Sequence, residues 1–259
     1  MALTNFAKQK ISEYLFEGSN SLSGFNGFYV ELITSTGAAY NSGSVADDRI
    51  GMNRSSVFWN AGSTSSNKTQ LTGLPNQQSG SQNITNFNLY INVIGGTVEK
   101  FAANEPLTNN ITILQGETPI IPVGALDVKF DFSSTDLESR VGHYVFEGAD
   151  QLGSYDSIRF RQYNNTAYLG KEVSLNRGSA SFDYSTSSNY TYNKIDFDFG
   201  VQGGTSNVTL NNIRVAIGGI STPYQDLGNA TMSSTSVAKG DTVRLKASTQ
   251  AFKFKYDIS

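Results

Sequence analysis

Residues able to do acid–base or metal chemistry are few in this chain. It contains no cysteine and one histidine, His143, which falls inside a predicted helix. Without a cysteine or a second histidine, neither a thiol nucleophile nor a zinc site of the usual kind can be assembled. A single histidine on a helix surface is most often a solvated or packing residue, so we expect no catalytic or metal-binding role for His143.

Two pairs of carboxylates are the remaining candidates. Asp47 and Asp48 are adjacent in a polar loop, where their oxygens could hold a calcium ion, although such pairs are usually just solvated. Asp196 and Asp198 alternate with apolar residues and should face water from one side of a strand. A glycosidase would need two carboxyl groups about 5–9.5 Å apart in a cleft. We expect surface acids here, and a protein that is not an enzyme.

Glycine-rich stretches do not supply a phosphate site. Gly95-Gly96 and Gly218-Gly219 lie at predicted strand ends and lack the helix that follows a phosphate-binding loop. We therefore expect no cofactor. The net charge of −3 argues against broad nucleic-acid binding, but it does not exclude a local basic patch. No stretch approaches the ~18 apolar residues of a membrane-spanning helix, and the N-terminus lacks the apolar core of a secretion signal.

Aromatic side chains are the best candidates for contact with a partner. The chain has thirteen tyrosines and one tryptophan, and both residue types are enriched at protein interfaces and can stack on sugars. Trp59 ends an apolar run, so core packing is the favoured interpretation for it. Five tyrosines in or beside polar loops form the candidate contact surface: Tyr40, Tyr163, Tyr168, Tyr190 and Tyr192.

The same pattern runs through the sequence twice. Tyr14-Leu15-Phe16-Glu17-Gly18 returns as Tyr144-Val145-Phe146-Glu147-Gly148, and further matches follow in order. They are Asn53-Arg54 with Asn176-Arg177, Ser63–Asn67 with Ser185–Asn189, Gln115–Thr118 with Lys239–Thr242, and Lys129–Asp131 with Lys255–Asp257. Ordered matches with drifting offsets indicate a duplicated domain whose loops have changed length. We therefore divide the chain into a first domain, 1–132, and a second domain, 133–259.

Each half begins with a predicted short helix. The first covers about 6–16, after Thr4 or its neighbour as cap, and the second starts at the capping-box spacing Thr135–Glu138. Gly18 and Gly148 supply the stops. A short amphipathic helix ahead of a sheet is expected to cover one face or one open end of that sheet.

Alternating apolar positions predict about six or seven strands in each half. The clearest sets are Phe28, Val30 and Leu32; Phe87, Leu89 and Ile91; Ile158, Phe160 and Gln162; Ile213, Val215 and Ile217; and the closing strands Leu126 to Phe130 and Phe252 to Tyr256. One buried face and one wet face is typical of antiparallel sheets. The predicted fold class is mainly β: two tandem, similar antiparallel β-sandwich domains, each preceded by a short N-terminal helix.

The N-terminal half resembles a known family. Met-Ala-Leu-Thr-Asn-Phe, followed by a helix ending in Tyr-Leu-Phe, is similar to the start of tailed-bacteriophage virion proteins of the tail or tail-fibre type. Asn83-Ile84-Thr85, the Gly95-Gly96 turn, Phe101, Leu107, Gly116-Glu117-Thr118 and Gly124 through Asp131 follow the family's closing strands in order. The resemblance covers about residues 2–131. The family is usually single-domain, so this chain departs from it by carrying two copies.

The resemblance implies a structural and assembly protein located in the virion of a tailed phage, at the tail tip, baseplate or fibre attachment. Its partners would be other virion proteins and copies of itself, with no nucleic acid and no membrane. A capsid decoration protein is one alternative; a carbohydrate-binding adhesin on host surface glycan and a hydrolase of such sugars are others. The duplication further predicts quasi-equivalent contacts by the two domains, so that three chains could complete a pseudo-sixfold ring.

Overall fold

The architecture is that of a mainly β protein. The computed structural model describes residues 2–93, 98–132, 134–187, 190–219, 224–247 and 254–255. Within them the strands form antiparallel sheets and each half adds one short helical segment, which confirms the predicted fold class. The predicted Gly95-Gly96 turn and the closing-strand positions Phe252 and Tyr256 lie outside the described residues.

The first half builds a sandwich around aromatic side chains. Its strands are β1 (Ala2–Leu3), β2 (Phe25–Thr34), β3 (Ile50–Asn53), β4 (Trp59–Asn60), β5 (Thr64–Asn67), β6 (Leu71–Thr72), β7 (Gln82–Val93), β8 (Val98–Ile113), β9 (Ile120–Ile121) and β10 (Asp127–Lys129). The sheets have the orders β1-β8-β7-β2-β3, β10-β5-β4 and β6-β9. The Phe28 ring on β2 lies 5.4 Å from the Trp59 ring on β4, so the two larger sheets face each other.

The second half repeats this plan. Its strands are β11 (Ser157–Asn164), β12 (Ala167–Asn176), β13 (Phe182–Ser185), β14 (Tyr190–Asn193), β15 (Phe197–Val201), β16 (Val208–Gly218), β17 (Gln225–Val237), β18 (Thr242–Leu245) and β19 (Phe254–Lys255). The sheets have the orders β12-β11-β16-β17, β13-β14-β19 and β15-β18. Strand for strand these match the first half, except that β1 has no counterpart among the described residues.

The predicted inward positions of the central strands are confirmed, whereas Ile33 and Asn88, predicted to face water, are buried as well. All the predicted inward residues of β2, β7, β11 and β16 are buried: Phe28, Val30, Leu32, Phe87, Leu89, Ile91, Ile158, Phe160, Gln162, Ile213, Val215 and Ile217. The side-chain period of two places one face of each strand in the sandwich and the other in solvent. Trp59 is fully buried, which confirms the core interpretation.

One of the predicted repeat matches is wrong. Asn67 at the end of β5 donates from its side chain to the carbonyls of Thr69 and Pro122. In the second half the residue with this role is Asn193 at the end of β14, which donates to the carbonyls of Ile195 and Lys246. Asn67 therefore corresponds to Asn193 and not to Asn189, because the hairpin leading to β14 is longer than its counterpart.

Both helical segments begin as α-helices and end as π-helices. α1 (Asn5–Ser12) leads into η1 (Glu13–Glu17), and α2 (Thr135–Gly142) leads into η2 (His143–Glu147). The predicted stops are confirmed, since Gly18 and Gly148 have φ of 69° and 75°, a left-handed conformation that glycine adopts without a steric penalty. The π turns have no signal in the spacing of apolar residues.

The N-terminal cap is at the predicted residue in the first helix but not in the second. The Thr4 side chain accepts a hydrogen bond from the Ala7 amide, as expected for the first helix. The second helix is capped by Ser134, whose side chain accepts from the Leu137 amide, so the predicted cap at Thr135 is wrong by one residue. Glu138 instead accepts from the amide of Phe132, ahead of the cap, at 3.0 Å.

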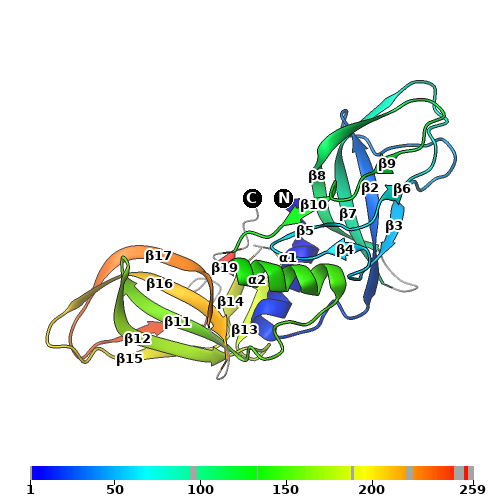
Figure 1. The fold of residues 1–259 in the computed structure, drawn as a ribbon. Coiled ribbons are helices and arrows are strands. Elements are labelled where there is room, and N and C mark those ends of the chain that lie inside the picture. Colours follow the sequence, from blue (N-terminus) through cyan, green and yellow to red (C-terminus); the bar gives the residue numbers. More distant parts are fainter. Residues whose placement is uncertain are drawn as a thin grey trace.

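The helices lie at the centre of the molecule. Figure 1 shows the two halves as separate β lobes with α1 and α2 between them. No described strand pair joins one half to the other. The buried apolar residues of both halves nevertheless form one continuous cluster, which passes through the helical segments.

Candidate functional site

The helical segments cross over between the halves. η1 packs on the second half, where the Phe16 ring lies 5.3 Å from the Phe182 ring of β13. In return η2 packs inside the first sandwich, with the Phe146 ring 4.4 Å from Trp59 and 5.4 Å from Phe28. Each half thus inserts an aromatic side chain into the core of the other.

The expectation that each helix covers one face or one open end of its own sheet is therefore incomplete, because each helical segment also packs on the opposite half. The start of α1 does contact its own half, since Thr4 Oγ1 donates to the Lys100 carbonyl of β8 at 2.5 Å. The end of α1 already faces the second half, where Ser12 Oγ and Thr191 Oγ1 are 2.5 Å apart. The consequence is a junction in which neither half closes its core alone.

Two arginines hold the exchanged π turns. Arg54 of the first half donates from Nε to the Val145 carbonyl at 2.6 Å and from Nη2 to the Tyr144 carbonyl. Arg177 of the second half donates in the same way to the carbonyls of Leu15, at 2.7 Å, and Tyr14. Carbonyls at a helix end lack partners within the helix, and a guanidinium fork can satisfy two of them at once.

The arginines also tie down the chain that follows each π turn. Nη1 of Arg54 donates to the Leu22 carbonyl at 2.8 Å, and Nη1 of Arg177 donates to the Leu152 carbonyl at 2.9 Å. Burial lowers the pKa of the Arg54 guanidinium to about 10, with an opposing contribution from Tyr144, and it also lowers the pKa of Arg177. Arg54 therefore stays charged at neutral pH and needs these carbonyls as partners.

A pair of stacked tyrosines lies where the two π turns meet. The rings of Tyr14 and Tyr144 are 3.5 Å apart between centroids and 7° from parallel. The Tyr14 hydroxyl donates to Asp150 Oδ1 at 3.0 Å, and the Tyr144 hydroxyl accepts from the Leu22 amide at 3.0 Å. Burial is the main cause that raises the pKa of both hydroxyls, so both stay neutral well into the alkaline range.

The contacts of the junction come in reciprocal pairs. Arg54 serves η2 as Arg177 serves η1, and Tyr14 stacks on its own counterpart, Tyr144. Such a pattern is that of an isologous interface, which closes on itself and does not propagate into a ring. The expected pseudo-sixfold ring concerns contacts between chains and not this junction within one chain, so it stays a prediction.

Close approach at the junction explains one glycine. A Cβ added to Gly142 would lie 2.3 Å from the Gly62 carbonyl oxygen of the first half. Glycine is unfavourable inside a helix, but here it lets α2 lie against the opposite half. The neighbouring His143 places Nδ1 2.8 Å from Glu147 Oε2, within the same helical segment. His143 is thus a helix-surface residue that contacts its own segment, as expected.

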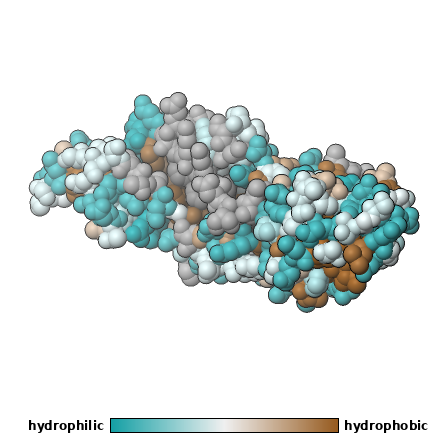
Figure 2. All heavy atoms as spheres, turned by 90° about the horizontal axis from the view of Figure 1, so that it is seen from above, coloured by the Kyte–Doolittle hydropathy of each residue, from teal (hydrophilic) through white to brown (hydrophobic). Residues whose placement is uncertain are grey.

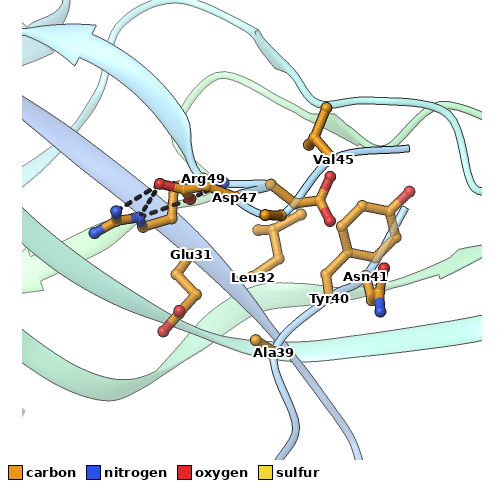
Figure 3. A pocket seen from close by; sticks show the side chains of 10 residues that line it. Glu31, Leu32, Ala39, Tyr40, Asn41, Val45, Asp47 and Arg49 are labelled. Carbon is orange, nitrogen blue, oxygen red and sulfur yellow. Dashed lines mark hydrogen bonds and ion pairs between the residues drawn. The ribbon is translucent and has the colours of Figure 1, made fainter. Parts of the chain in front are cut away.

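The predicted acids at 47 and 48 line a pocket of about 300 Å³, which Figure 3 shows. Asp47 pairs with Arg49, whose guanidinium lowers the pKa of the carboxyl, and Asp48 Oδ2 accepts from the Ser42 amide at 2.8 Å. Among the described residues no group of three His, Cys, Asp or Glu side chains could hold a metal ion. Asp47 is therefore engaged in an ion pair and the calcium interpretation gains no support.

Asp196, just before β15, and Asp198 on β15 both face water, as expected. Asp198 pairs with Arg244 of β18, with Nε 2.7 Å from Oδ1, and Asp196 accepts from the Ala247 amide. Phe197 between them is buried in the sandwich. This arrangement supports a pair of surface acids and shows no facing carboxylates.

The structure places the five candidate contact tyrosines in different environments. Tyr40, Tyr163 and Tyr190 are buried, at 5%, 8% and 6% exposure, so the expectation of a contact surface is wrong for them. The Tyr40 hydroxyl, for example, donates to the Leu74 carbonyl at 2.7 Å, which turns a loop residue inward. Tyr168 is 46% exposed and Tyr192 is half-buried, so these two remain candidates.

Sequence reasoning missed the residues that hold the junction. In the sequence, Arg54 and Arg177 stand out only because they occupy matching positions in the two repeats. Their retention in both copies, together with the retained Tyr-x-Phe-Glu-Gly segments, was a usable signal, but it does not say that the two elements meet across the halves.

Comparisons with known proteins do not assign the chain to a family. No protein-family model matches the chain, and a search of curated proteins finds no significant match. None of the helices among the described residues is long and apolar enough to cross a membrane.

Proposed function

We propose that this protein is a structural and assembly component of a tailed-phage particle, associated with the tail, and that it acts through protein–protein contacts. The resemblance of residues 2–131 to virion proteins of the tail or tail-fibre type suggests the setting. The observation that carries an assembly role is the reciprocal exchange of η1 and η2, which makes two repeats into a single unit with a continuous core.

The exchange has a consequence for where partners bind. Both helical segments contribute their buried side to the junction, so we expect the outer sheet faces and sheet edges to supply most of the surface that each lobe offers to neighbours. In the first half, the exposed large apolar side chains among the described residues are Val45, Val57, Leu74, Leu114, Ile120 and Val123. Figure 2 shows apolar side chains gathered on one side of the first-half lobe, at the right of the view. Apolar surface of this kind is typical of a protein interaction site.

Nothing in the described residues favours a catalytic alternative. Both predicted acids that line the pocket beside Tyr40 already have partners. Asp47 is paired with Arg49, and Asp48 accepts a hydrogen bond from a backbone amide. A carbohydrate-binding adhesin would need a row of open aromatic rings, and three of the five candidate tyrosines, Tyr40, Tyr163 and Tyr190, are buried.

The location of the chain in the particle tests the proposal. A cryo-electron microscopy reconstruction of intact particles should show density for two joined β lobes at the tail tip, baseplate or fibre attachment. Density on the outside of the capsid would replace the tail assignment by the capsid-decoration alternative. A particle that lacks the chain, or purified protein that turns over a host polysaccharide, would refute the assembly role.

A further inference from the structure

The outer face of the second-half sheet carries an unfavourable charge arrangement. Arg161 on β11 lies directly opposite Arg214 on β16 in the strand register. Like charges directly opposite each other destabilise a sheet. Arg159, two residues earlier on β11, points to the same face, because side chains alternate along a strand. We call these three residues the arginine face.

Tyrosine rings support the three guanidinium groups from below. Arg159 lies 3.4 Å from the Tyr224 ring centroid, Arg214 lies 4.1 Å from that of Tyr163, and Arg161 lies 5.9 Å from that of Tyr168. A cation–π contact of this kind attracts the guanidinium group to the ring and does not use its N–H groups as a carboxylate would.

Carboxylates in the described part of the chain do not balance this charge. Glu172 serves two arginines, at 3.0 Å from Arg161 Nε and 3.6 Å from Arg159 Nη1. No ion pair to Arg214 is found among the described residues, and the buried Nε atoms of Arg159 and Arg214 have no hydrogen-bond partner there. Asp226 on β17 is exposed and stands opposite Ala216, at the rim of the face.

The first half serves as an internal control for what the fold requires. By strand register, Glu31 and Asn88 occupy the positions of Arg161 and Arg214. There the pair is favourable, since Asn88 Nδ2 donates to Glu31 Oε2 at 2.6 Å. Tyr29 likewise occupies the position of Arg159. The same module therefore folds without the three arginines, and their presence in the second half is not needed for the sheet.

We infer that the arginine face is a docking surface for an acidic segment of a partner protein. Guanidinium forks pair bidentately with carboxylates, and arginine and tyrosine are the residue types that dominate the binding energy of protein interfaces. Bases and sugars need open aromatic faces for stacking, whereas Tyr163 and Tyr224 lie under guanidinium groups. This inference deepens the proposed function and rests on it, because it names the chemistry of one assembly partner.

The test uses the full chain and the residues of its own first half. The double variant Arg159→Tyr with Arg214→Asn introduces side chains that the equivalent positions already carry. The matched control, Lys68→Gln with Lys129→Gln, removes the same charge from two exposed positions in the first half. A fluorescent oligo-glutamate peptide is the probe, followed by anisotropy at low ionic strength, beside a hyaluronan oligosaccharide and an oligothymidylate of equal charge.

The wild-type chain should bind the oligo-glutamate peptide more tightly than the other two polyanions. The double variant should bind it at least about tenfold more weakly, while the lysine control binds like wild type. The single variant Arg214→Lys, which keeps the charge but loses the fork, should lie between them. Equal weakening in the control, or no binding by wild type, would overturn the site; preference for either other polyanion would overturn the protein partner.

These outcomes are separate from those that test the proposed function. A chain located in the tail that fails to bind the acidic peptide would remove only the docking surface. A chain that binds the peptide through Arg159 and Arg214 but is missing from the particle would remove only the tail assignment.

Discussion

Replacing Arg177 by alanine should weaken the first half as much as the second. Arg177 belongs to the second half, and it donates to the carbonyls of Leu15, Tyr14, Leu152 and Tyr155. Hydrogen bonds from a charged donor contribute about 1.5–3 kcal/mol each. Burying a guanidinium opposes this by several kcal/mol, and the lowered pKa of Arg177 shows that burial does disfavour the charge. We expect a net loss of about 3 kcal/mol, a large share of the 5–15 kcal/mol typical of a domain.

The single tryptophan makes this loss measurable across the junction. Trp59 lies in the first half and contacts Phe146 of η2, so its fluorescence reports on the first core and on the exchanged segment. In urea unfolding, Arg177→Ala should move the Trp59 transition and the far-ultraviolet circular dichroism transition together. Arg177→Lys, which lacks the fork, should recover only part of the loss.

The control for this experiment is Arg244→Ala. Arg244 also lies in the second half, but its ion pair with Asp198 is on the surface, and exposed pairs contribute little. We expect it to leave both transitions in place. The reasoning would be refuted if Arg177→Ala left the Trp59 transition unchanged while the second half unfolded separately.

Two further predictions follow from the junction. Gly142→Ala should lower the free energy of unfolding, measured in denaturant, by about 1–3 kcal/mol, because its Cβ would meet the Gly62 carbonyl. Gly178→Ala, with open space around it, should leave the stability unchanged. Equal effects of the two substitutions would contradict the close approach at Gly142. Burial raises the pKa of the Tyr14 hydroxyl above its ordinary value of 10.0, so this hydroxyl stays neutral in the folded state. Its contribution to the free energy of unfolding is complete below pH 10. Above that pH the contribution is lost, because Tyr14 ionises in the unfolded chain. Tyr14→Phe should therefore be less stable than wild type at neutral pH but lose stability less steeply between pH 9 and about pH 11, as unfolding midpoints measured across that range will show; parallel curves would contradict a buried Tyr14 hydroxyl.

The sheets could be predicted because their signal is local. Alternation at Phe28, Val30 and Leu32 reports directly which side of the strand is buried, and each predicted inward position is buried. The helix ends at Gly18 and Gly148 could be predicted because a left-handed backbone conformation at the C-terminal cap strongly favours glycine. The repeat further predicted that the two halves share a strand plan.

The junction could not be predicted because it depends on contacts between distant segments. Tyr14, Leu15 and Phe16 are consecutive and all buried, a pattern that a helix lying on one sheet would not produce. A sequence shows this apolar run but not that it enters the opposite half. The prediction that Tyr40 belongs to a contact surface was wrong for a related reason. Its loop is polar in sequence, yet the ring points inward and its hydroxyl donates a hydrogen bond to the Leu74 carbonyl.

The exchange of helical segments is tested most directly by cutting the chain between its halves. A protease site inserted between Phe132 and Ser134 divides the protein into two fragments that no longer share a covalent bond. If η1 and η2 are exchanged, the cleaved protein should still elute as one species, with the 28.0 kDa of the chain plus the inserted site, under native conditions and separate only in denaturant. Two folded fragments that separate on cleavage, without denaturant, would contradict the account.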